Sequence, residues 1–235
     1  MALRYDDFLA AKCRDWIGCG MAVDDLPGPL FLFQDRLTRW ALRKGRAALW
    51  ADTGLGKTRM QVAWASCIPG RVLIVAPLCV GPQTIAEARA IGVDFDAIDI
   101  TNYERLHHVD PSRYTGVVLD ESSILKSFDG KTRGRLIGAF RETPYRLCCT
   151  ATPAPNDIAE VANHCEFLGI MTRTEMLATF FVHDDEGWRL KGHAHEAFYR
   201  WLASWGMFLR RPSDLGFSDE GYALPPLTIR DIVVP

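Results

Sequence analysis

The amino-acid sequence predicts an α/β fold, a doubly wound parallel sheet with helices on both faces. From about residue 47 onward, short apolar runs rich in β-branched residues alternate with segments of helical pattern. Several of these runs are apolar throughout instead of alternating with polar residues, which is typical of parallel strands covered on both faces. With 235 residues and 48% hydrophobic content, the chain is long enough to bury one full core.

The expected elements follow one another in strand–helix–strand order. Five strands are predicted, at Ala47–Ala51, Arg71–Pro77, Phe95–Ile100, Gly116–Asp120 and Tyr145–Thr150. Helix start signals mark two of the segments between and after them, because Pro82 opens Pro82–Ile91 and Asn156 precedes Asp157–Leu168. Near the N-terminus, Tyr5–Trp16 is also expected to be helical.

Beyond residue 168 the pattern changes to that of a small C-terminal helical protrusion. Thr174–Phe180 has a helical pattern, and Phe181–Lys191 is typical of a hairpin with a polar tip. One face of a further helix carries Phe198, Trp201, Leu202 and Trp205. Such a stripe can stack nucleic-acid bases, but its helical spacing favours core packing. The proline-punctuated tail Ala223–Pro235 ends in a strand-like run, Leu227–Val234, as at a crossing into another domain.

The charge of the chain excludes a globally basic nucleic-acid-binding protein. Its formal net charge is −2, so any contact with DNA must come from local basic clusters. A solvated helix face explains such a cluster about as well as nucleic-acid contact does. The two clusters are Arg36, Arg39, Arg43, Lys44 and Arg46, and Lys126, Lys131, Arg133, Arg135 and Arg141.

The seven cysteines follow no metal-ligand spacing, and adjacent Cys148 and Cys149 would point to opposite faces of a strand. The pairs His107–His108 and His193/His195 lack carboxylate or cysteine partners at ligand spacing, so we expect surface histidines there. No apolar run is long enough to cross a bilayer. We therefore expect a soluble, reduced, cytoplasmic protein without a membrane partner.

A glycine-rich segment between a predicted strand and a predicted helix has the features of a phosphate-binding loop. It reads Ala51-Asp52-Thr53-Gly54-Leu55-Gly56-Lys57-Thr58, with alanine where the general pattern has glycine. The glycines let backbone N–H groups point at phosphate oxygens, and the helix N-terminus adds partial positive charge. Lys57 would reach the terminal phosphates, and Thr58 would ligate magnesium. The alternative is a glycine-rich turn with a chance lysine.

A second segment, Val117-Val118-Leu119-Asp120-Glu121, brings two carboxylates to the end of a hydrophobic strand. Ligands of open α/β sheets bind at the carboxyl ends of the strands. Asp120 would hold magnesium, directly or through water, and Glu121 would orient and deprotonate the attacking water. The alternative is that the two acids cap a helix at Ile124–Lys126.

Together with these two segments, the sequence resembles the SWI/SNF-type branch of superfamily-two helicases, which are nucleic-acid motors with two RecA-like lobes. The segments that carry the resemblance follow the family's order: Phe31-Leu32-Phe33-Gln34 (Q motif), the phosphate loop (motif I), Val72–Val80 (motif Ia), Ile100-Thr101-Asn102-Tyr103-Glu104 (motif Ib), Asp120–Ser127 (motif II) and Thr150-Ala151-Thr152-Pro153 with Asn156 (motif III). The compact segments between motifs are more like those of phage or bacterial members. Coverage is roughly residues 30 to 235.

The resemblance implies ATP and Mg²⁺ as cofactors and assigns roles residue by residue. Catalytic roles fall to Glu121 and Lys57, and magnesium to Thr58 and Asp120. The ATP-binding set is Gln34, Thr53, Gly54, Leu55, Gly56, Lys57, Thr58 and Arg59, with Gln34 reading the adenine edge. Thr150 and Thr152 couple the ATP state to the grip on the strand. Nucleic-acid contacts are implied for Pro77, Thr101, Asn102 and Lys126.

The resemblance also implies a domain division and departs from the family pattern at three positions. Residues 1–30 are expected to be an N-terminal helical extension, 31–168 the RecA-like ATP-binding core, and 169–235 a helical protrusion with a segment leading to an absent second lobe. Ser122 and Ser123 replace a small residue and a histidine of motif II, and Pro155 replaces a glutamine of motif III. The link from motif II to motif III is therefore expected to be weaker or rerouted.

The leading functional hypothesis is the first lobe of a motor that couples ATP hydrolysis to movement along double-stranded DNA, without sequence preference. Motifs IV to VI and their arginine fingers are absent, so this lobe alone is expected to bind ATP and hydrolyse it very slowly. A second RecA-like lobe, in cis or in trans, is the expected partner. The alternatives are the lobe of a strand-separating DNA or RNA helicase, and a free-standing nucleotide-dependent module that binds nucleic acid.

Overall fold

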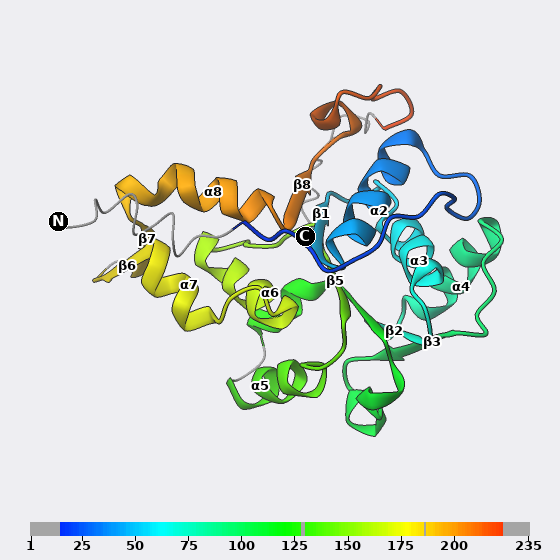
Figure 1. The fold of residues 1–235 in the computed structure, drawn as a ribbon, viewed down its shortest axis with the longest axis horizontal. Coiled ribbons are helices and arrows are strands. Elements are labelled where there is room, and N and C mark those ends of the chain that lie inside the picture. Colours follow the sequence, from blue (N-terminus) through cyan, green and yellow to red (C-terminus); the bar gives the residue numbers. More distant parts are fainter. Residues whose placement is uncertain (1–14, 128–129, 186, 223–235) are drawn as a thin grey trace, which may run out of the picture.

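Six parallel strands form the central sheet, in the order β3-β2-β4-β5-β1-β8 (Figure 1). The computed structural model describes residues 15–127, 130–185 and 187–222. The strands are β1 (Arg46–Ala51), β2 (Val72–Ala76), β3 (Ile98–Asn102), β4 (Gly116–Asp120), β5 (Tyr145–Cys149) and β8 (Gly206–Leu209). Every neighbouring pair is parallel, which confirms the predicted sheet.

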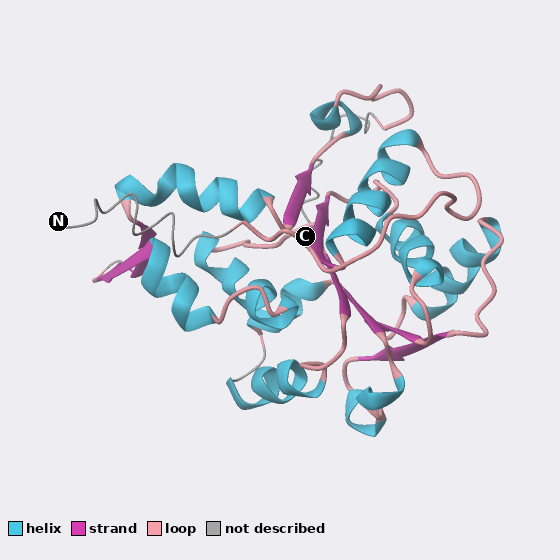
Figure 2. Cartoon of the chain, in the orientation of Figure 1, coloured by secondary structure: helices cyan, strands magenta, loops and turns pink. Residues whose placement is uncertain are grey.

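Helices cover both faces of this sheet, as Figure 2 shows. On one face lie α2 (Leu32–Lys44), α3 (Lys57–Cys67) and α4 (Gly81–Ala90); on the other lie α5 (Gly130–Ala139), α6 (Val161–Leu168), α7 (Arg173–Phe180) and α8 (His195–Ala203). Successive strand residues alternate between the two cores, so Cys148 packs with α5–α8 and Cys149 with α2–α4, as predicted. Short 3-10 helices lie at Leu106–His108 (η1), Pro111–Arg113 (η2), Ser122–Lys126 (η3), Ile158–Glu160 (η4), Gly192–Ala194 (η5) and Pro212–Leu215 (η6).

Two predicted elements differ from the structure by more than one residue at an end or in their division. The strand predicted at Phe95–Ile100 begins at Ile98 instead, because residues 95–98 form a turn in which the Ile98 N–H donates to the Phe95 carbonyl. The helix predicted at Asp157–Leu168 is divided into η4 and α6, and the Asp157 carboxylate accepts from the Ala159 N–H at the start of η4.

The protrusion consists of α7, a two-stranded antiparallel hairpin and α8, at the left of Figure 1. Its hairpin, β6 (Phe181–Asp184) with β7 (Gly187–Leu190), and the helix α7 confirm the predicted pattern. The side chains of Phe198, Trp201 and Trp205 are at most 1% exposed. The aromatic stripe is therefore core, and it is not available for stacking on bases.

After the protrusion the chain returns to the central sheet through β8, a strand that was not predicted. β8 pairs with β1, and its first residue, Gly206, has no room for a side chain because an added Cβ would lie 2.6 Å from the Trp50 ring. The sequence indicated only a segment that closes the lobe here. Gly206–Leu209 is only four residues long, so its hydrophobic periodicity is too weak to identify a strand from sequence. The sheet thus continues beyond the expected boundary at residue 168.

Residues 15–30 form no helix and run as a strap across the ends of α2 and α8. The Trp16 N–H donates to Ser204 Oγ at 2.8 Å, and the Cys19 and Met21 N–H groups donate to carbonyls of Lys44 and Leu42. Most of the helix predicted at Tyr5–Trp16 lies outside the described residues, as does the whole tail Ala223–Pro235 with its strand-like run. Among the described helices, none is both long and apolar enough to cross a lipid bilayer.

The buried aromatic stripe predicts a large difference between two adjacent residues. Phe198 is fully buried and contacts the rings of Phe180 and Phe181, whereas neighbouring Tyr199 is 44% exposed. We expect Phe198→Ala to lower the free energy of unfolding by about 3–5 kcal/mol because it removes a core ring and leaves a cavity. The control, Tyr199→Ala, should cost about 1 kcal/mol or less. Urea unfolding measures both, and equal losses would contradict the assignment of this face to the core.

Candidate nucleotide-binding site

The phosphate loop joins the end of β1 to the start of α3 at the carboxyl edge of the sheet. Gly54 and Gly56 have φ angles of +83° and +74°, which side-chain-bearing residues rarely adopt. An added Cβ on Gly56 would lie 2.4 Å from Gln34 Nε2, whereas one on Gly54 would meet no atom within 4 Å. Gly56 is the residue before the first turn of α3, where backbone N–H groups have no partner in the helix. The N–H groups of this first turn therefore lack partners within the helix and can donate to a ligand.

Lys57 and Thr58 occupy the first turn of α3. The Lys57 ammonium donates to the carbonyls of Ala51 and Asp52, with Nζ–O distances of 3.0 and 3.3 Å. The Asp52 carboxylate in turn accepts from the Thr53 N–H at 2.7 Å. The Lys57 ammonium group therefore lies against the backbone of the loop. A phosphate group bound there can replace the two neutral carbonyl groups as the partner of this ammonium.

Gln34 connects the start of α2 to the phosphate loop. Its side chain is 2% exposed; Nε2 donates to the Leu55 carbonyl at 3.0 Å, and Oε1 accepts from the Phe31 N–H at 3.1 Å. Each end of the amide keeps one further hydrogen-bonding capacity, so contact with an adenine edge stays a prediction. The structure adds a role that was not predicted, which is to hold the loop at Leu55.

Two aromatic residues lie beside Gln34, and one of them, Tyr222, was missed by sequence reasoning. Phe31 is 54% exposed, and its ring centroid is 5.6 Å from that of Tyr222 in an edge-to-face arrangement. Burial raises the pKa of Tyr222, while nearby Arg59 opposes that rise. Arg59 Nε donates to a carboxylate oxygen of Glu87 on α4 at 2.8 Å. Nothing in the sequence could place Tyr222 here, because it follows Phe31 by nearly the whole domain.

Asp120 ends β4 as a buried carboxylate. Asp120 is 5% exposed, and its Oδ1 accepts from Gln61 Nε2 at 2.6 Å. Burial raises the pKa of Asp120, and the hydrogen bond from Gln61 only partly opposes that rise. Gln61, one helical turn after Lys57, was not predicted; its signal is a polar residue in an otherwise apolar stretch of α3. The two residues bring α3 and β4 together at the phosphate loop.

Glu121 has a φ of +49°, and no other described non-glycine residue has a positive φ. This strained conformation is typical of functional sites. The Thr150 hydroxyl donates to Glu121 Oε2 at 3.1 Å and accepts from the Thr152 N–H at 3.1 Å. The Glu121 side chain makes no capping hydrogen bond to η3, so the structure does not support the helix-capping alternative for this residue. The two predicted coupling residues are thereby connected to Glu121.

The serine substitutions in motif II reroute the link to motif III. The buried Ser122 hydroxyl donates to the Cys149 carbonyl at 3.2 Å, at the end of β5. Together with the bond between Thr150 and Glu121, it ties the ends of β4 and β5 side by side. The two segments are thus joined although Ser123 stands where the resembled family has a histidine.

Tyr103 connects the predicted nucleic-acid segment to the magnesium candidate. Its hydroxyl donates to the backbone carbonyl of Asp120 at 2.6 Å. Burial raises the pKa of Tyr103 well above its usual value, so the hydroxyl stays protonated and donates. Tyr103 lies in the segment predicted as motif Ib, directly after Asn102 at the end of β3.

Three of the four predicted nucleic-acid residues line one pocket of about 580 Å³. Pro77, Thr101 and Asn102 lie there together with Arg105 and His108, which were not predicted. The Asn102 carboxamide accepts from the Arg105 N–H at 2.8 Å and so shapes the turn that presents this arginine. The fourth residue, Lys126, does not line the pocket; its Nζ lies 3.9 Å from a Glu160 carboxylate oxygen.

The raised pKa of Asp120 predicts the sign of a stability effect. Ionised Asp120 destabilises the fold at pH values above its raised pKa, and this cost disappears as the pH falls toward the unfolded value. We expect Asp120→Asn, which can still accept from Gln61, to resist urea better than the original chain at pH 8. The difference in free energy of unfolding between Asp120→Asn and the original chain should narrow on acidification to pH 4. The control Asp94→Asn, at an exposed position, should have the same free energy of unfolding as the original chain at both pH values. A gap that widens on acidification would contradict the buried-carboxylate assignment.

No protein-family model and no curated protein sequence matches the chain. Among solved structures, it is similar to the Sulfolobus solfataricus SWI2/SNF2 ATPase core in complex with dsDNA, with a TM-score of 0.66 and 18% identity. The match covers 83% of this chain and 47% of that chain, so the present chain spans about half of its length.

Two structures of UvsW from bacteriophage T4, one described as a helicase, are also similar, each with 15% identity over 73% of this chain. They have TM-scores of 0.49 and 0.48, and the matches cover 67% and 38% of those chains. The fold assignment therefore rests on the archaeal structure. The chain has an α/β fold similar to that of the SWI2/SNF2 ATPase core, with a parallel six-stranded sheet.

Proposed function

We propose that this chain is the ATP-binding first lobe of a DNA-dependent motor of the SWI/SNF type. One observation carries the proposal: the glycine loop, Lys57 and the pair Asp120–Glu121 meet at the carboxyl edge of one parallel sheet. A helix N-terminus and a lysine beside two carboxylates suit a nucleoside triphosphate with a divalent cation. The described residues contain no group of three or more His, Cys, Asp or Glu that could hold a metal by itself.

The residues at the loop fit magnesium held jointly with phosphate. Thr58 and Asp120 supply oxygen ligands, which Mg²⁺ prefers, and the buried Gln61 Oε1 has no hydrogen-bond partner among the described residues. That orphaned oxygen can accept from a water molecule of the ion's hydration shell. Bound Mg²⁺ would neutralise phosphate charge. Lys57 and the loop N–H groups would hold the phosphate oxygens, and Glu121, fixed by Thr150, would orient the attacking water.

The base of the nucleotide is expected between Gln34 and the aromatic pair Phe31 and Tyr222. A carboxamide can both donate to and accept from the adenine edge. The half-exposed Phe31 ring is available for stacking, and the Tyr222 ring packs against it at nearly a right angle. Arg59 would lie against the base only after parting from Glu87.

The pocket lined by Pro77, Thr101, Asn102 and Arg105 supports contact with a nucleic-acid backbone. Hydroxyl, carboxamide and guanidinium groups are donors to phosphate oxygens and carry no sequence preference. The similar archaeal structure was determined in complex with dsDNA, which favours duplex DNA as the ligand. Tyr103, the residue after Asn102, donates to the Asp120 carbonyl and offers a physical connection between the two sites.

A second RecA-like lobe is the proposed partner. The transition state of phosphoryl transfer needs positive charge from an arginine, a contribution on the order of 10³–10⁵ in rate. Arg59, the arginine nearest in sequence to Lys57, is held by Glu87 instead. We therefore expect slow phosphate release from this chain alone, and faster release once a second lobe and DNA are supplied.

The nucleotide assignment predicts that Lys57→Ala weakens binding of MgATP. The change removes a charged donor to the phosphates, which is worth roughly 10- to 100-fold in affinity. Isothermal titration calorimetry on both proteins measures the difference. Lys131→Ala, which removes an exposed lysine on α5, is the matched control and should bind as the original chain does. Equal affinity for Lys57→Ala and Lys131→Ala would contradict the phosphate-loop assignment.

The nucleic-acid assignment predicts weak, salt-sensitive binding of duplex DNA by this chain, with a Kd of roughly 10⁻⁴–10⁻⁶ M. Arg105→Ala should weaken binding equally for unrelated sequences and lower the salt slope by about one. Arg200→Ala, a change at an exposed residue of α8 at the opposite end of Figure 1 from β3, should leave both quantities unchanged. Fluorescence anisotropy at several salt concentrations distinguishes the variants. If both arginine changes have the same effect, the pocket is not the binding site.

A further inference from the structure

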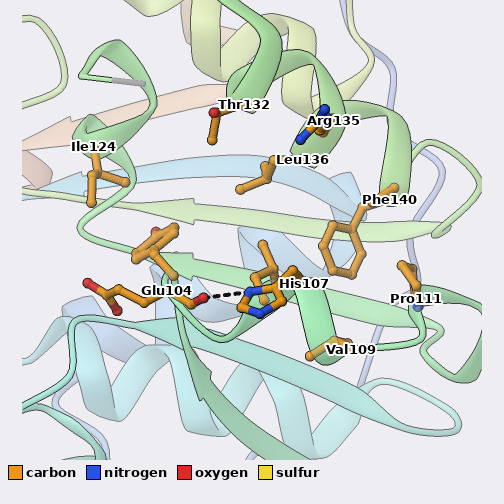
Figure 3. A pocket seen from close by; sticks show the side chains of 12 residues that line it. Glu104, His107, Val109, Pro111, Ile124, Thr132, Arg135, Leu136 and Phe140 are labelled. Atoms are coloured by element: carbon orange, nitrogen blue, oxygen red, sulfur yellow. Dashed lines mark hydrogen bonds between the residues drawn. The ribbon is translucent and has the colours of Figure 1, made fainter. Parts of the chain in front are cut away.

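A second pocket of about 580 Å³ lies between helix α5 and the segment that follows β3. Figure 3 shows it from close by. Its walls are mainly apolar and come from three parts of the chain: the segment after β3, η3, and α5 with its C-terminal end. The apolar residues are Leu106, Val109, Ile124, Leu136 and Phe140. Leu136 and Phe140 are at most 5% exposed and belong to the core that packs against the sheet. The pocket therefore has a rigid apolar floor.

The size and lining are those of a small-molecule site. Ligand pockets typically enclose about 300–1,000 Å³ and combine apolar walls with a few convergent polar groups. Here the polar groups are at the two ends. Arg135 lies on α5 at one end, and the Glu104 carboxylate lies at the other end, away from Arg135 in Figure 3. The Glu104 carbonyl is bound to His107 Nδ1 at 2.8 Å, which holds that wall in place.

Arg135 gives the pocket its chemical preference. It is exposed, and it forms no ion pair with an acidic side chain in the described ranges 15–127, 130–185 and 187–222. An unpaired guanidinium at the mouth of an apolar pocket attracts a carboxylate or a similar planar anion, which it can bind through two hydrogen bonds. We propose that this pocket binds a small ligand with a flat apolar body and a single anionic group, the body between Leu136 and Val109 and the anion at Arg135.

The pocket is in contact with both ends of the Asp120–Glu121 turn. Tyr103 forms part of its wall, and the same side chain donates to the Asp120 carbonyl. Ile124, in the opposite wall, belongs to η3, which directly follows Glu121. A ligand that moves Tyr103 or η3 therefore changes the position of the two carboxylates, and this coupling rests on the nucleotide site proposed above. Coupling between two binding sites is reciprocal, so nucleotide would also change the ligand's affinity.

The first experiment tests the pocket without nucleotide, using 2-naphthoate as the probe in isothermal titration calorimetry. We expect one site per chain with a Kd on the order of 10⁻⁴ M, ordinary for a ligand of this size. Ala139→Trp, at an exposed residue of the pocket wall, should fill the cavity and weaken binding at least tenfold. Thermal unfolding checks that this variant remains folded. No heat of binding at millimolar probe, or unchanged binding to folded Ala139→Trp, would overturn the site.

The anion preference has its own pair of variants. Arg135→Ala should weaken 2-naphthoate binding several-fold and leave binding of the neutral 2-naphthamide unchanged. Arg141→Ala removes an equally exposed arginine just beyond α5 that lines a different pocket, so it should change neither ligand. If Arg135→Ala and Arg141→Ala behave alike, or if the amide binds as well as the acid, the preference for an anion is wrong.

The coupling is measured as the change in MgATP affinity when 2-naphthoate is near saturation. We expect a change of threefold or more in the original chain and none in Tyr103→Phe, which loses the hydrogen bond to Asp120 but keeps the pocket wall. An unchanged MgATP affinity in the original chain would overturn the coupling. Absence of MgATP binding without 2-naphthoate would contradict the nucleotide site instead, while the naphthoate titration would still decide the pocket.

Discussion

The burial of β1 between β5 and β8 is the constraint on which the rest of the structure depends. Its residues from Ala47 to Ala51 are at most 3% exposed, and parallel partners flank it on both sides. Such a strand cannot slip by one residue without moving its side chains to the wrong face. The phosphate loop therefore leaves the sheet at a fixed point. Because all six strands are parallel, β4 and β5 end at the same edge, beside the loop.

Hydrogen bonds then fix the two carboxylates from several directions. Gln61 on α3 donates to the Asp120 carboxylate, and Thr150 after β5 donates to the Glu121 carboxylate. Tyr103 after β3 donates to the backbone carbonyl of Asp120 and so holds the end of β4. Ionised Asp120 is poorly solvated in this position, so a bound cation would relieve a cost that the empty fold carries. The strained backbone of Glu121 turns its side chain toward Thr150. The arrangement is thus more favourable with a charged ligand than without one.

The end of β3 and the segment that follows it separate two different kinds of proposed binding surface. One side contributes Thr101, Asn102 and Arg105 to a polar pocket, and the other contributes Tyr103 and Leu106 to an apolar one; Val109 lines both. A single short stretch of chain therefore contacts a proposed nucleic-acid site, a proposed ligand site and the Asp120 carbonyl. Movement of this stretch would couple the binding of either proposed ligand to the proposed nucleotide site.

The sequence by itself determined the parallel sheet, the glycine-rich loop after β1 and the strand-end carboxylates, because each depends on a local pattern. Apolar runs, glycine spacing and acids after a strand are readable without knowing what packs against them. Only the tertiary structure decided the sixth strand, β8, the contact of Tyr222 with Phe31, and the gathering of Arg105 with Pro77. These features join segments that are far apart in the chain or too short to show a hydrophobic periodicity. Which of these segments pack together is decided only when the whole core forms, because each pairing is stabilised by burial against the rest of the core.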